Sequence, residues 1–194
     1  GQFNVYNSLA AIGVALVEGV PIQVIQQALS KMKAIPGRFQ KVLAAAPFSV
    51  FIDYSHTPDS LKNCIATARE FCKGRIITVF GAGGHRDRGK RPIMGEIAGR
   101  LSDVCFVTSD NPREESPEGI IQDILAGMKG PYTKAKIVQM PDRRQAIGEA
   151  IGLGMAGDVI LICGKGHENY QIIGEETLHF DDYEEALSQL QKRQ

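Results

Sequence analysis

Charged and polar residues gather in short loops that each follow an apolar stretch of the sequence. Four such loops carry residue types that can bind a charged small molecule. They are Asp53-Tyr54-Ser55-His56-Thr57, Gly81-Ala82-Gly83-Gly84-His85-Arg86-Asp87, Ser109-Asp110-Asn111-Pro112-Arg113 and Gly164-Lys165-Gly166-His167-Glu168. The loops expected at the opposite ends of the strands, such as Lys73-Gly74, are short and plain. This uneven distribution favours one binding crevice where the four loops meet.

The third of these loops joins a rigid turn to a planar arginine. The guanidinium of Arg113 can donate two parallel hydrogen bonds, which suits the capture of a carboxylate. Asp110, Asn111 and Pro112 would hold the turn that presents it. A type I turn with a solvent-facing arginine is the plainer alternative, and turn statistics alone favour it.

The fourth loop places glycines on both sides of a lysine. Gly164 and Gly166 allow the backbone to approach a ligand closely, and Glu168 adds an acceptor for an ammonium group. The same residues would also make an ordinary turn at the end of a strand. The loop is therefore a candidate half of a site for a ligand that carries both charges.

The second loop is crowded with cations at the expected start of a helix. Arg86, Arg88, Lys90 and Arg91 lie where the helix dipole disfavours positive charge, so we expect a carboxylate or phosphate ligand to bind there. A flexible surface turn is the alternative. The glycine-to-lysine spacing from Gly84 resembles a phosphate loop, but Arg91 stands where a serine or threonine would bind magnesium. No self-contained phosphate loop is predicted in this chain.

Other catalytic chemistries find little support. The four histidines show no zinc-type spacing, so no metal site is predicted. No Gly-x-Ser-x-Gly elbow is present for nucleophilic catalysis. His56 is a candidate general base because histidine titrates near neutral pH, although a hydrogen-bonded turn residue is the plainer interpretation.

Composition excludes further classes of function. The 194 residues are 43% hydrophobic and 23% charged, as expected for a globular protein. Basic and acidic residues number 22 each, so no net positive charge is available to hold nucleic acid. No apolar run approaches the ~20 residues of a membrane span. The four cysteines lack CxxC spacing, which suggests reduced thiols and a cytoplasmic protein.

Two helices and a linker are predicted ahead of the main domain. Apolar residues recur at three-to-four spacing between Asn7 and Met32, with a break at Gly19 and Pro21. The stretch Ile35-Pro36-Gly37-Arg38 then ends the helical pattern. We therefore expect a small helical segment over residues 1–36 and a second domain over residues 37–194. The chain begins with glycine rather than methionine, and we expect it to be part of a longer protein.

The second domain alternates short apolar runs with helix-like segments. The predicted strands are Phe48 to Asp53, Arg75 to Phe80, Asp103 to Thr108, Lys136 to Met140 and Asp158 to Cys163. Their nearly continuous apolar character is typical of a parallel sheet covered on both faces. The pattern predicts a doubly wound, mostly parallel, Rossmann-like α/β fold. A short antiparallel pair, Tyr170 to Ile173 with Thr177 to Phe180, and a helix from Asp182 complete it.

Seven short motifs, taken together, carry a family resemblance. They are Phe3-Asn4-Val5-Tyr6-Asn7, Pro36-Gly37-Arg38-Phe39, Asp53 to Asp59, Arg86 to Pro92, Asp110 to Arg113, Gly164 to Glu168 and His179-Phe180-Asp181-Asp182. In order and spacing they resemble the UDP-N-acetylmuramoyl-tripeptide synthetases of the Mur ligase family. Each motif is short, but seven in register are highly specific. The resemblance covers nearly the whole chain.

The resemblance implies an ATP-dependent amide ligation through an acyl phosphate, in peptidoglycan precursor synthesis. The implied cofactors are ATP and Mg²⁺, bound mainly by a central domain of which residues 1–36 would be the helical end. The implied substrates are UDP-MurNAc-dipeptide and an amino acid. In this family the tetrapeptide that matches Asp110 to Arg113 marks the enzymes that add meso-diaminopimelate rather than lysine. Without a phosphate loop, this chain alone is expected to be inactive.

Residue roles follow by match to the family motifs. The positions implied to bind diaminopimelate are Arg86, Asp110, Asn111, Pro112, Arg113, Gly164 and Glu168. Those implied to bind ATP are Asn4, Asn7, Arg38 and Asp53. Arginine with asparagine would clamp the distal carboxylate of the substrate, and Glu168 would pair with its distal ammonium. His85 departs from the acidic or small residue that is common at its position.

Two alternatives remain at this stage. A relative that adds lysine, or a ligase of the folylpolyglutamate or cyanophycin type, would share much of the fold. Arg113 argues against a lysine-adding relative. A small-molecule binding module without catalysis is the third interpretation.

Overall fold

The computed structural model describes residues 2–32 and 34–193, with only the backbone described for residues 2 and 3. Phe3, which opens the first family motif, therefore has its side chain outside the described part. Contacts divide the chain into two compact units, Gly1–Ala34 and Ile35–Gln194. The division falls close to the boundary expected between residues 36 and 37.

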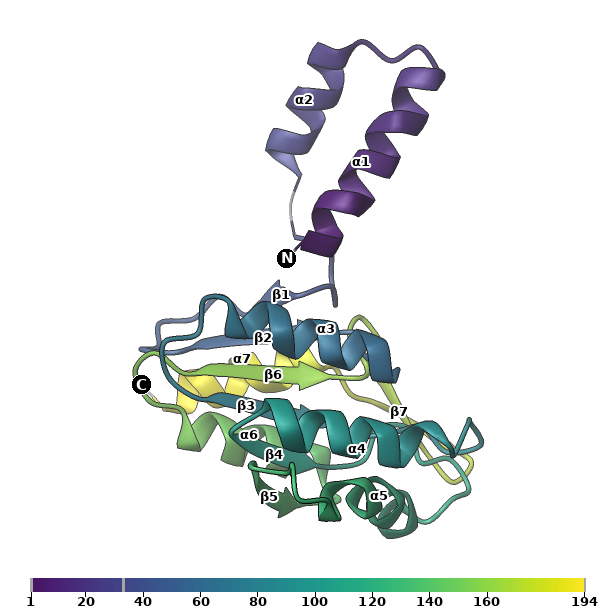
Figure 1. Ribbon diagram of the computed structural model, residues 1–194, viewed down its shortest axis with the longest axis vertical. Coiled ribbons are helices and arrows are strands. Elements are labelled where there is room, and N and C mark those ends of the chain that lie inside the picture. Colours follow the sequence, from purple (N-terminus) through teal and green to yellow (C-terminus); the bar gives the residue numbers. More distant parts are fainter. Residues whose placement is uncertain (1, 33, 194) are drawn as a thin grey trace. The chain divides into compact units, whose positions relative to one another are not determined.

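The first unit is a pair of helices, as predicted (Figure 1). Helix α1 (Gln2–Val17) begins earlier than the apolar pattern indicated, and α2 (Ile22–Lys31) follows a short turn. Gly19 closes α1 in the left-handed region, with a φ of 77°. Asn4 and Asn7 are exposed on α1. Among the described residues, no helix has both the length and the apolar character that crossing a membrane requires.

A six-stranded sheet forms the centre of the second unit. Its strands are β1 (Gln40–Lys41), β2 (Ser49–Asp53), β3 (Ile76–Phe80), β4 (Val104–Val107), β5 (Lys136–Gln139) and β6 (Val159–Cys163). Their order is β1-β2-β6-β3-β4-β5, and only β1 is antiparallel to its neighbour. The mostly parallel sheet is confirmed. The two-residue β1 was not predicted, because it is too short to show a pattern.

Helices cover both faces of this sheet (Figure 1). One face packs against α3 (Pro58–Arg69), α4 (Lys90–Leu101) and α5 (Pro117–Ala126), and the other against α6 (Arg143–Leu153) and α7 (Asp182–Lys192). Alternate residues of β3 serve the two cores: Ile76 and Phe80 face the first, Ile77 and Val79 the second. All four are fully buried. The three-layer doubly wound arrangement confirms the predicted fold class.

Helix starts are fixed at the carboxyl edge of the sheet. Thr57 caps α3 in a capping box with Ser60, and Ser116, Asp142 and Asp181 cap α5, α6 and α7. Helix α4 is different, because Gly89 offers no side chain to cap it. The backbone N of Gly89 itself donates to Asp87 Oδ1 at 2.8 Å.

The predicted antiparallel pair is confirmed near the end of the chain. Strands β7 (Tyr170–Ile173) and β8 (Glu176–His179) pair through a turn at Gly174, whose φ is 59°. The hairpin attaches to the loop after β4, where the backbone of Arg113 bridges to Ile173 in parallel. It thus supports the turn that was predicted to bind substrate.

Candidate functional site

The loops that follow β2, β3, β4 and β6 meet at one edge of the sheet, as expected for parallel strands. Glycines allow them to touch. A Cβ at Gly84 would collide with the carbonyl of Pro112, and one at Gly164 with the carboxylate of Asp110. Gly166 packs equally closely on Tyr54. The loops therefore form one interlocked structure.

Asn111 lies at the centre of this structure and is only 3% exposed. Its Oδ1 accepts hydrogen bonds from Lys165 Nζ at 3.0 Å and from the backbone N of Ile172 at 3.1 Å. Its Nδ2 donates to Glu168 Oε2 at 2.9 Å. These contacts use both lone pairs of the amide oxygen and one of the two amide hydrogens. Asn111 therefore orients its neighbours and keeps a single hydrogen for a ligand.

Glu168 is half-buried among three polar neighbours. Besides Asn111, its Oε2 lies 3.5 Å from the Nζ of Lys165, a fully buried side chain. Burial lowers the pKa of Lys165, while the charge of Asp110 opposes that change. On the other side, burial and then the Glu168 carboxylate raise the pKa of Tyr54. The carboxylate of Glu168 is thus held in a fixed orientation.

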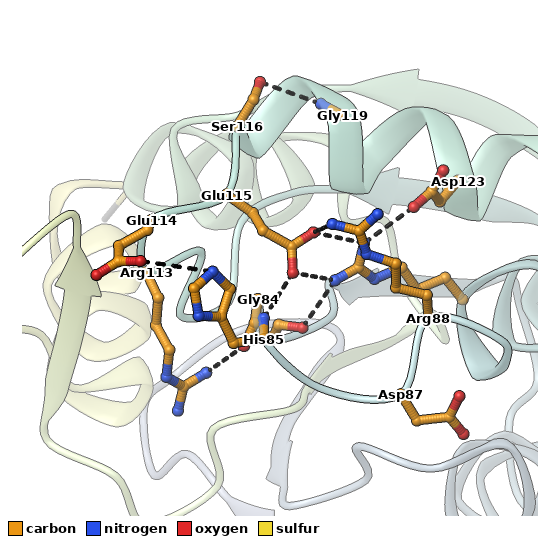
Figure 2. Close-up of polar contacts among 12 residues, drawn as sticks. Gly84, His85, Asp87, Arg88, Arg113, Glu114, Glu115, Ser116, Gly119 and Asp123 are labelled. Carbon is orange, nitrogen blue, oxygen red and sulfur yellow. Dashed lines mark hydrogen bonds and ion pairs between the residues drawn. The ribbon is translucent and has the colours of Figure 1, made fainter.

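Arg113 is held at both ends. Its backbone adopts a left-handed φ of 54°, with its N donating to Ile172 O at 3.0 Å and its O accepting from Gly174 N at 2.8 Å. Its Nη1 donates to Gly84 O at 2.9 Å (Figure 2). It also donates, more weakly, to Asn111 O at 3.4 Å. Within the described residues, Nε and Nη2 have no hydrogen-bond acceptor. These two adjacent donors form an edge that suits a carboxylate.

The four cations around the start of α4 differ in their surroundings. Arg86 is exposed, and only its Nη1 is engaged, with His85 O at 3.3 Å. Lys90 Nζ donates to His56 O at 2.8 Å. Arg91 is buried and pairs with Glu115 and Asp123, and Arg88 also pairs with Glu115. The expectation of a bound anion is therefore wrong for Arg88 and Arg91, since the protein supplies their carboxylates.

Glu115 was missed by the sequence analysis. Its Oε1 accepts from the backbone N of His85 at 2.6 Å and from Arg91 Nη2 at 3.0 Å. Its Oε2 accepts from Arg88 Nη2 at 3.0 Å and from Arg91 Nη1 at 2.9 Å. The arginines and this backbone bond lower the pKa of Glu115 to about 2. A signal did exist, because Arg91 shares a helix face with Met94 and Ala98 and so needed a buried partner.

The residues assigned to ATP by resemblance are spread over both units. Asp53 is 8% exposed, and its carboxylate accepts hydrogen bonds from the backbone N of Phe39 at 2.8 Å and from Ser55 Oγ. Arg38 is exposed, with its Cζ 5.0 Å from the ring centre of Tyr54. Asn4 and Asn7 lie in the helical unit. In the second unit, Arg38 thus has a side chain accessible to an anion.

His56 makes a local contact. Its Nδ1 lies 2.8 Å from the backbone O of Tyr54, and its ring centre lies 4.5 Å from that of Tyr54. This geometry matches the plainer interpretation of a turn residue. A role as general base stays a prediction.

A buried ion pair behind the site was also missed. Arg143 is fully buried and bonds both oxygens of Asp182, at 2.8 and 2.7 Å. It also donates to the carbonyls of Ser109, the first residue of the loop after β4, and of Cys163, the residue before the loop after β6. Burial opposes the charged form, but Asp182 keeps the pKa of Arg143 raised. The pair fixes the ends of β4 and β6 relative to α7.

A metal site is not evident in the part of the chain that is described. No group of three or more His, Cys, Asp or Glu side chains is arranged there to hold an ion.

Comparison with known proteins places these observations in context. A ligase from Syntrophomonas wolfei, named UDP-N-acetylmuramoyl-L-alanyl-D-glutamate--2,6-diaminopimelate ligase, is 51% identical over 190 residues. The alignment covers 98% of this chain and 39% of that protein. The ligase of the same name from Clostridium botulinum is 47% identical over 95% of this chain and 38% of its own length. The chain thus spans about two fifths of these relatives.

Solved structures agree with the sequence comparison. A structure of a ligase with the same name is 37% identical, with a TM-score of 0.77, over 100% of this chain and 39% of that one. The UDP-N-acetylmuramate-alanine ligase of Thermotoga maritima is 21% identical with a TM-score of 0.63, covers 100% of this chain and 38% of its own, and shares the fold. The family model for the Mur ligase, glutamate ligase domain, matches residues 37–166. The chain therefore belongs to the Mur ligase family.

Proposed function

We propose that this chain forms the amino-acid-accepting part of an ATP-dependent ligase that joins meso-diaminopimelate to UDP-N-acetylmuramoyl-L-alanyl-D-glutamate in peptidoglycan precursor synthesis. The names of the relatives that are about half identical support this proposal. The site supports it independently, because it offers cationic and anionic groups within one set of interlocked loops. Diaminopimelate carries both a carboxylate and an ammonium at its distal end.

The free edge of Arg113 is the observation that carries the proposal. Its Nε and Nη2 would receive the distal carboxylate in a bidentate pair, and Arg86 would add positive charge from the neighbouring loop. Glu168 would receive the distal ammonium, to which it presents a carboxylate held by Asn111. Lysine has the ammonium but no distal carboxylate. The site therefore distinguishes the two amino acids by the arginine, and not by the glutamate.

Catalysis by this part of the enzyme would consist mainly of positioning. ATP supplies the phosphoryl group that converts the donor carboxylate into a reactive acyl phosphate. The residues described above would hold the distal end of the acceptor so that its other amine, unprotonated, lies at attack distance. The attack forms the amide and releases phosphate, and the amine proton passes to solvent. No dedicated base is required of this chain.

The nucleotide would be held mainly outside this chain. Arg38 presents an exposed guanidinium beside Tyr54, which suits a phosphate group. Asp53 has its two oxygens engaged within the protein, so a contact with ribose would have to share them. Asn4 and Asn7 have exposed side chains that can approach a nucleotide. Mg²⁺ would likewise be held mainly outside this chain.

We propose that the enzyme is cytoplasmic. All four cysteines are free, including Cys64 and Cys163, whose Sγ atoms lie only 3.8 Å apart in the core. Close free thiols are compatible with a reducing compartment. The nucleotide-linked substrate and ATP are available in the same compartment.

A comparison of three amino-acid acceptors, each tested separately, tests the proposal. The whole enzyme that contains this chain should be given ATP, UDP-MurNAc-dipeptide and one of three acceptors: meso-diaminopimelate, lysine or glutamate. We expect kcat/KM to be highest for meso-diaminopimelate, with one ADP formed per amide. A higher kcat/KM for lysine or glutamate would show instead a lysine-adding or a folylpolyglutamate-type ligase. Binding of an acceptor without ADP formation would indicate a binding module.

A further inference from the structure

We propose that Glu115 is a positioning residue that sets the direction of the Arg113 guanidinium, and thereby the preference for an acceptor with a distal carboxylate. The inference rests on the proposed function. Glu115 would not touch the substrate. It would act through the loop between β3 and α4, to which it is bonded (Figure 2).

The path from Glu115 to Arg113 is short and continuous. Glu115 Oε1 holds the backbone N of His85, and the carbonyl of the preceding residue, Gly84, accepts from Arg113 Nη1. Gly84 N in turn donates to Asn111 O at 2.9 Å. The Gly84-His85 turn is therefore clamped between the side chain of Glu115 and the loop that carries Arg113. Moving this turn would move the acceptor that fixes Nη1.

The backbone of the turn needs this support. His85 has a left-handed φ of 52°, which residues with a side chain rarely adopt. The hydrogen bond from its N to Glu115 Oε1, at 2.6 Å, ties this conformation to the segment after β4. Arg91 Nη2 adds a longer bond, 3.3 Å, to Gly83 O. Glu115 also orients Arg91, so it supports the turn both directly, through His85 N, and indirectly, through Arg91.

Neighbouring positive charges explain how the carboxylate of Glu115 can lie close to the proposed site for the distal carboxylate of the substrate. An unmatched Glu115 would repel the distal carboxylate of the substrate. Arg91 and Arg88 both pair with it, so its charge is balanced on the side away from Arg113. Because only Nη1 of Arg113 bonds to the loop, the N–H groups of Nε and Nη2 remain as donors for the ligand.

Asp123 provides a matched control. It pairs with the same buried arginine, at 2.9 Å from Arg91 Nη1, but it is half exposed and bonds no atom of the Gly84-His85 turn. Replacing Asp123 by asparagine removes one anionic partner of Arg91 and leaves the turn in place. If charge balance around Arg91 were the cause, the Asp123 variant should show the same kind of selective loss, although a smaller one, because Asp123 makes one bond to Arg91 and Glu115 makes two. The positioning role predicts no selective loss in the Asp123 variant.

The test uses the whole enzyme with Glu115→Gln and Asp123→Asn. We expect Glu115→Gln to lower kcat/KM for meso-diaminopimelate by about tenfold or more, mainly through KM, because misplacement of a binding group by 1 Å can cost up to about a hundredfold. The value for lysine and the KM for ATP should change by less than about threefold. Asp123→Asn should change none of these by more than about threefold.

A double-mutant cycle with Arg113→Ala isolates the route of action. If Glu115 acts through Arg113, then Glu115→Gln should cause no further loss for meso-diaminopimelate in the Arg113→Ala enzyme. Additive losses, or equal losses for both acceptors in the single variant, would overturn the inference. If Glu115→Gln does not fold, Glu115→Asp keeps the charge but is too short to hold the backbone N of His85, and should show a comparable and equally selective loss. A wild-type enzyme that does not prefer meso-diaminopimelate would instead refute the proposed function.

Discussion

The two edges of the parallel sheet use their charged residues in opposite ways. At the amino edge, Asp158 accepts hydrogen bonds from the backbone N, Nε and Nη2 of Arg75 and from the backbone N of Met155. Asp103 binds Arg69 and the backbone N of Ile76. The carboxylates of this edge have their hydrogen-bonding capacity committed to the protein.

At the carboxyl edge, some charged side chains keep hydrogen-bond donors that are not used within the protein. Arg113 leaves Nε and Nη2 without an acceptor among the described residues, and Arg86 has one nitrogen engaged. Buried charges at both edges have partners, as their desolvation requires. What marks the binding site is therefore a charged group that is held in place and still has unused donors. The following predictions test that distinction.

The largest expected effect is at Arg113. In the whole enzyme, Arg113→Ala should lower kcat/KM for meso-diaminopimelate by about two orders of magnitude or more, because a stranded carboxylate costs ~2–5 kcal/mol. The rate with lysine, which has no such group, should change little. Arg113→Lys should restore only part of the activity, since an ammonium cannot form the planar pair. Equal losses of kcat/KM with both amino acids would show that Arg113 does not recognise the distal carboxylate.

A smaller loss is expected at Glu168. Glu168→Gln should raise KM for meso-diaminopimelate by about tenfold, because a charge-assisted bond to the distal ammonium becomes a neutral one. The hydrogen bond from Asn111 can persist, so the loop should keep its shape. KM for ATP should stay within a factor of about two. A comparable loss of ATP affinity would assign Glu168 another role.

At the opposite edge we expect a stability effect without a kinetic one. Asp158→Asn should lower the free energy of unfolding by about 1–3 kcal/mol, because donors from Arg75 and Met155 lose a charged acceptor. Values of kcat/KM for both acceptors should be unchanged. Denaturant titration and steady-state kinetics on the same preparation measure the two quantities. A selective loss of meso-diaminopimelate turnover in this variant would contradict the claim that charged residues at the amino edge serve stability and not binding.

The ion pair between Asp158 and Arg75 predicts that the free energy of unfolding depends on pH. Burial opposes the charged form of Asp158, but the bonds from Arg75 prevail and lower its pKa below the usual 3.8. A lowered folded-state pKa means that the stabilisation is complete above the unfolded pKa and is lost as pH falls through the folded value. The difference in unfolding free energy between wild type and Asp158→Asn should therefore be constant near neutrality and shrink below about pH 4. A difference that grew with acid would contradict the assigned cause.

Much of the fold could be predicted from the sequence, because the central strands β3, β4 and β6 are buried on both faces. Strand β6 is buried throughout, and its run of aliphatic residues was recognised with no knowledge of its partners. Its insertion between β2 and β3 could not be predicted in the same way. Strand order depends on contacts between residues about a hundred positions apart. The Arg143–Asp182 pair, which relies on that order, was missed for the same reason.

The site was predicted as a set of loops but not as a set of roles. Glycine, proline and charged residues after each strand located the crevice. Whether a charged side chain is paired within the protein or available to a ligand depends on partners in other loops, as Arg86 and Arg91 show. They are five residues apart in one basic stretch, yet one is exposed and the other is buried against Glu115. Asn111 uses most of its hydrogen-bonding capacity to orient Lys165 and Glu168, and its expected contact with substrate stays a prediction.

A crystal structure of the whole enzyme with bound meso-diaminopimelate would test the central claim most directly. The account predicts that one carboxylate of the ligand lies about 2.7–2.9 Å from both Nε and Nη2 of Arg113, with the ammonium of the same end at Glu168. The hydrogen bond from Nη1 to Gly84 should persist. A ligand whose carboxylate binds elsewhere, with the Nε and Nη2 edge of Arg113 turned to solvent, would contradict it.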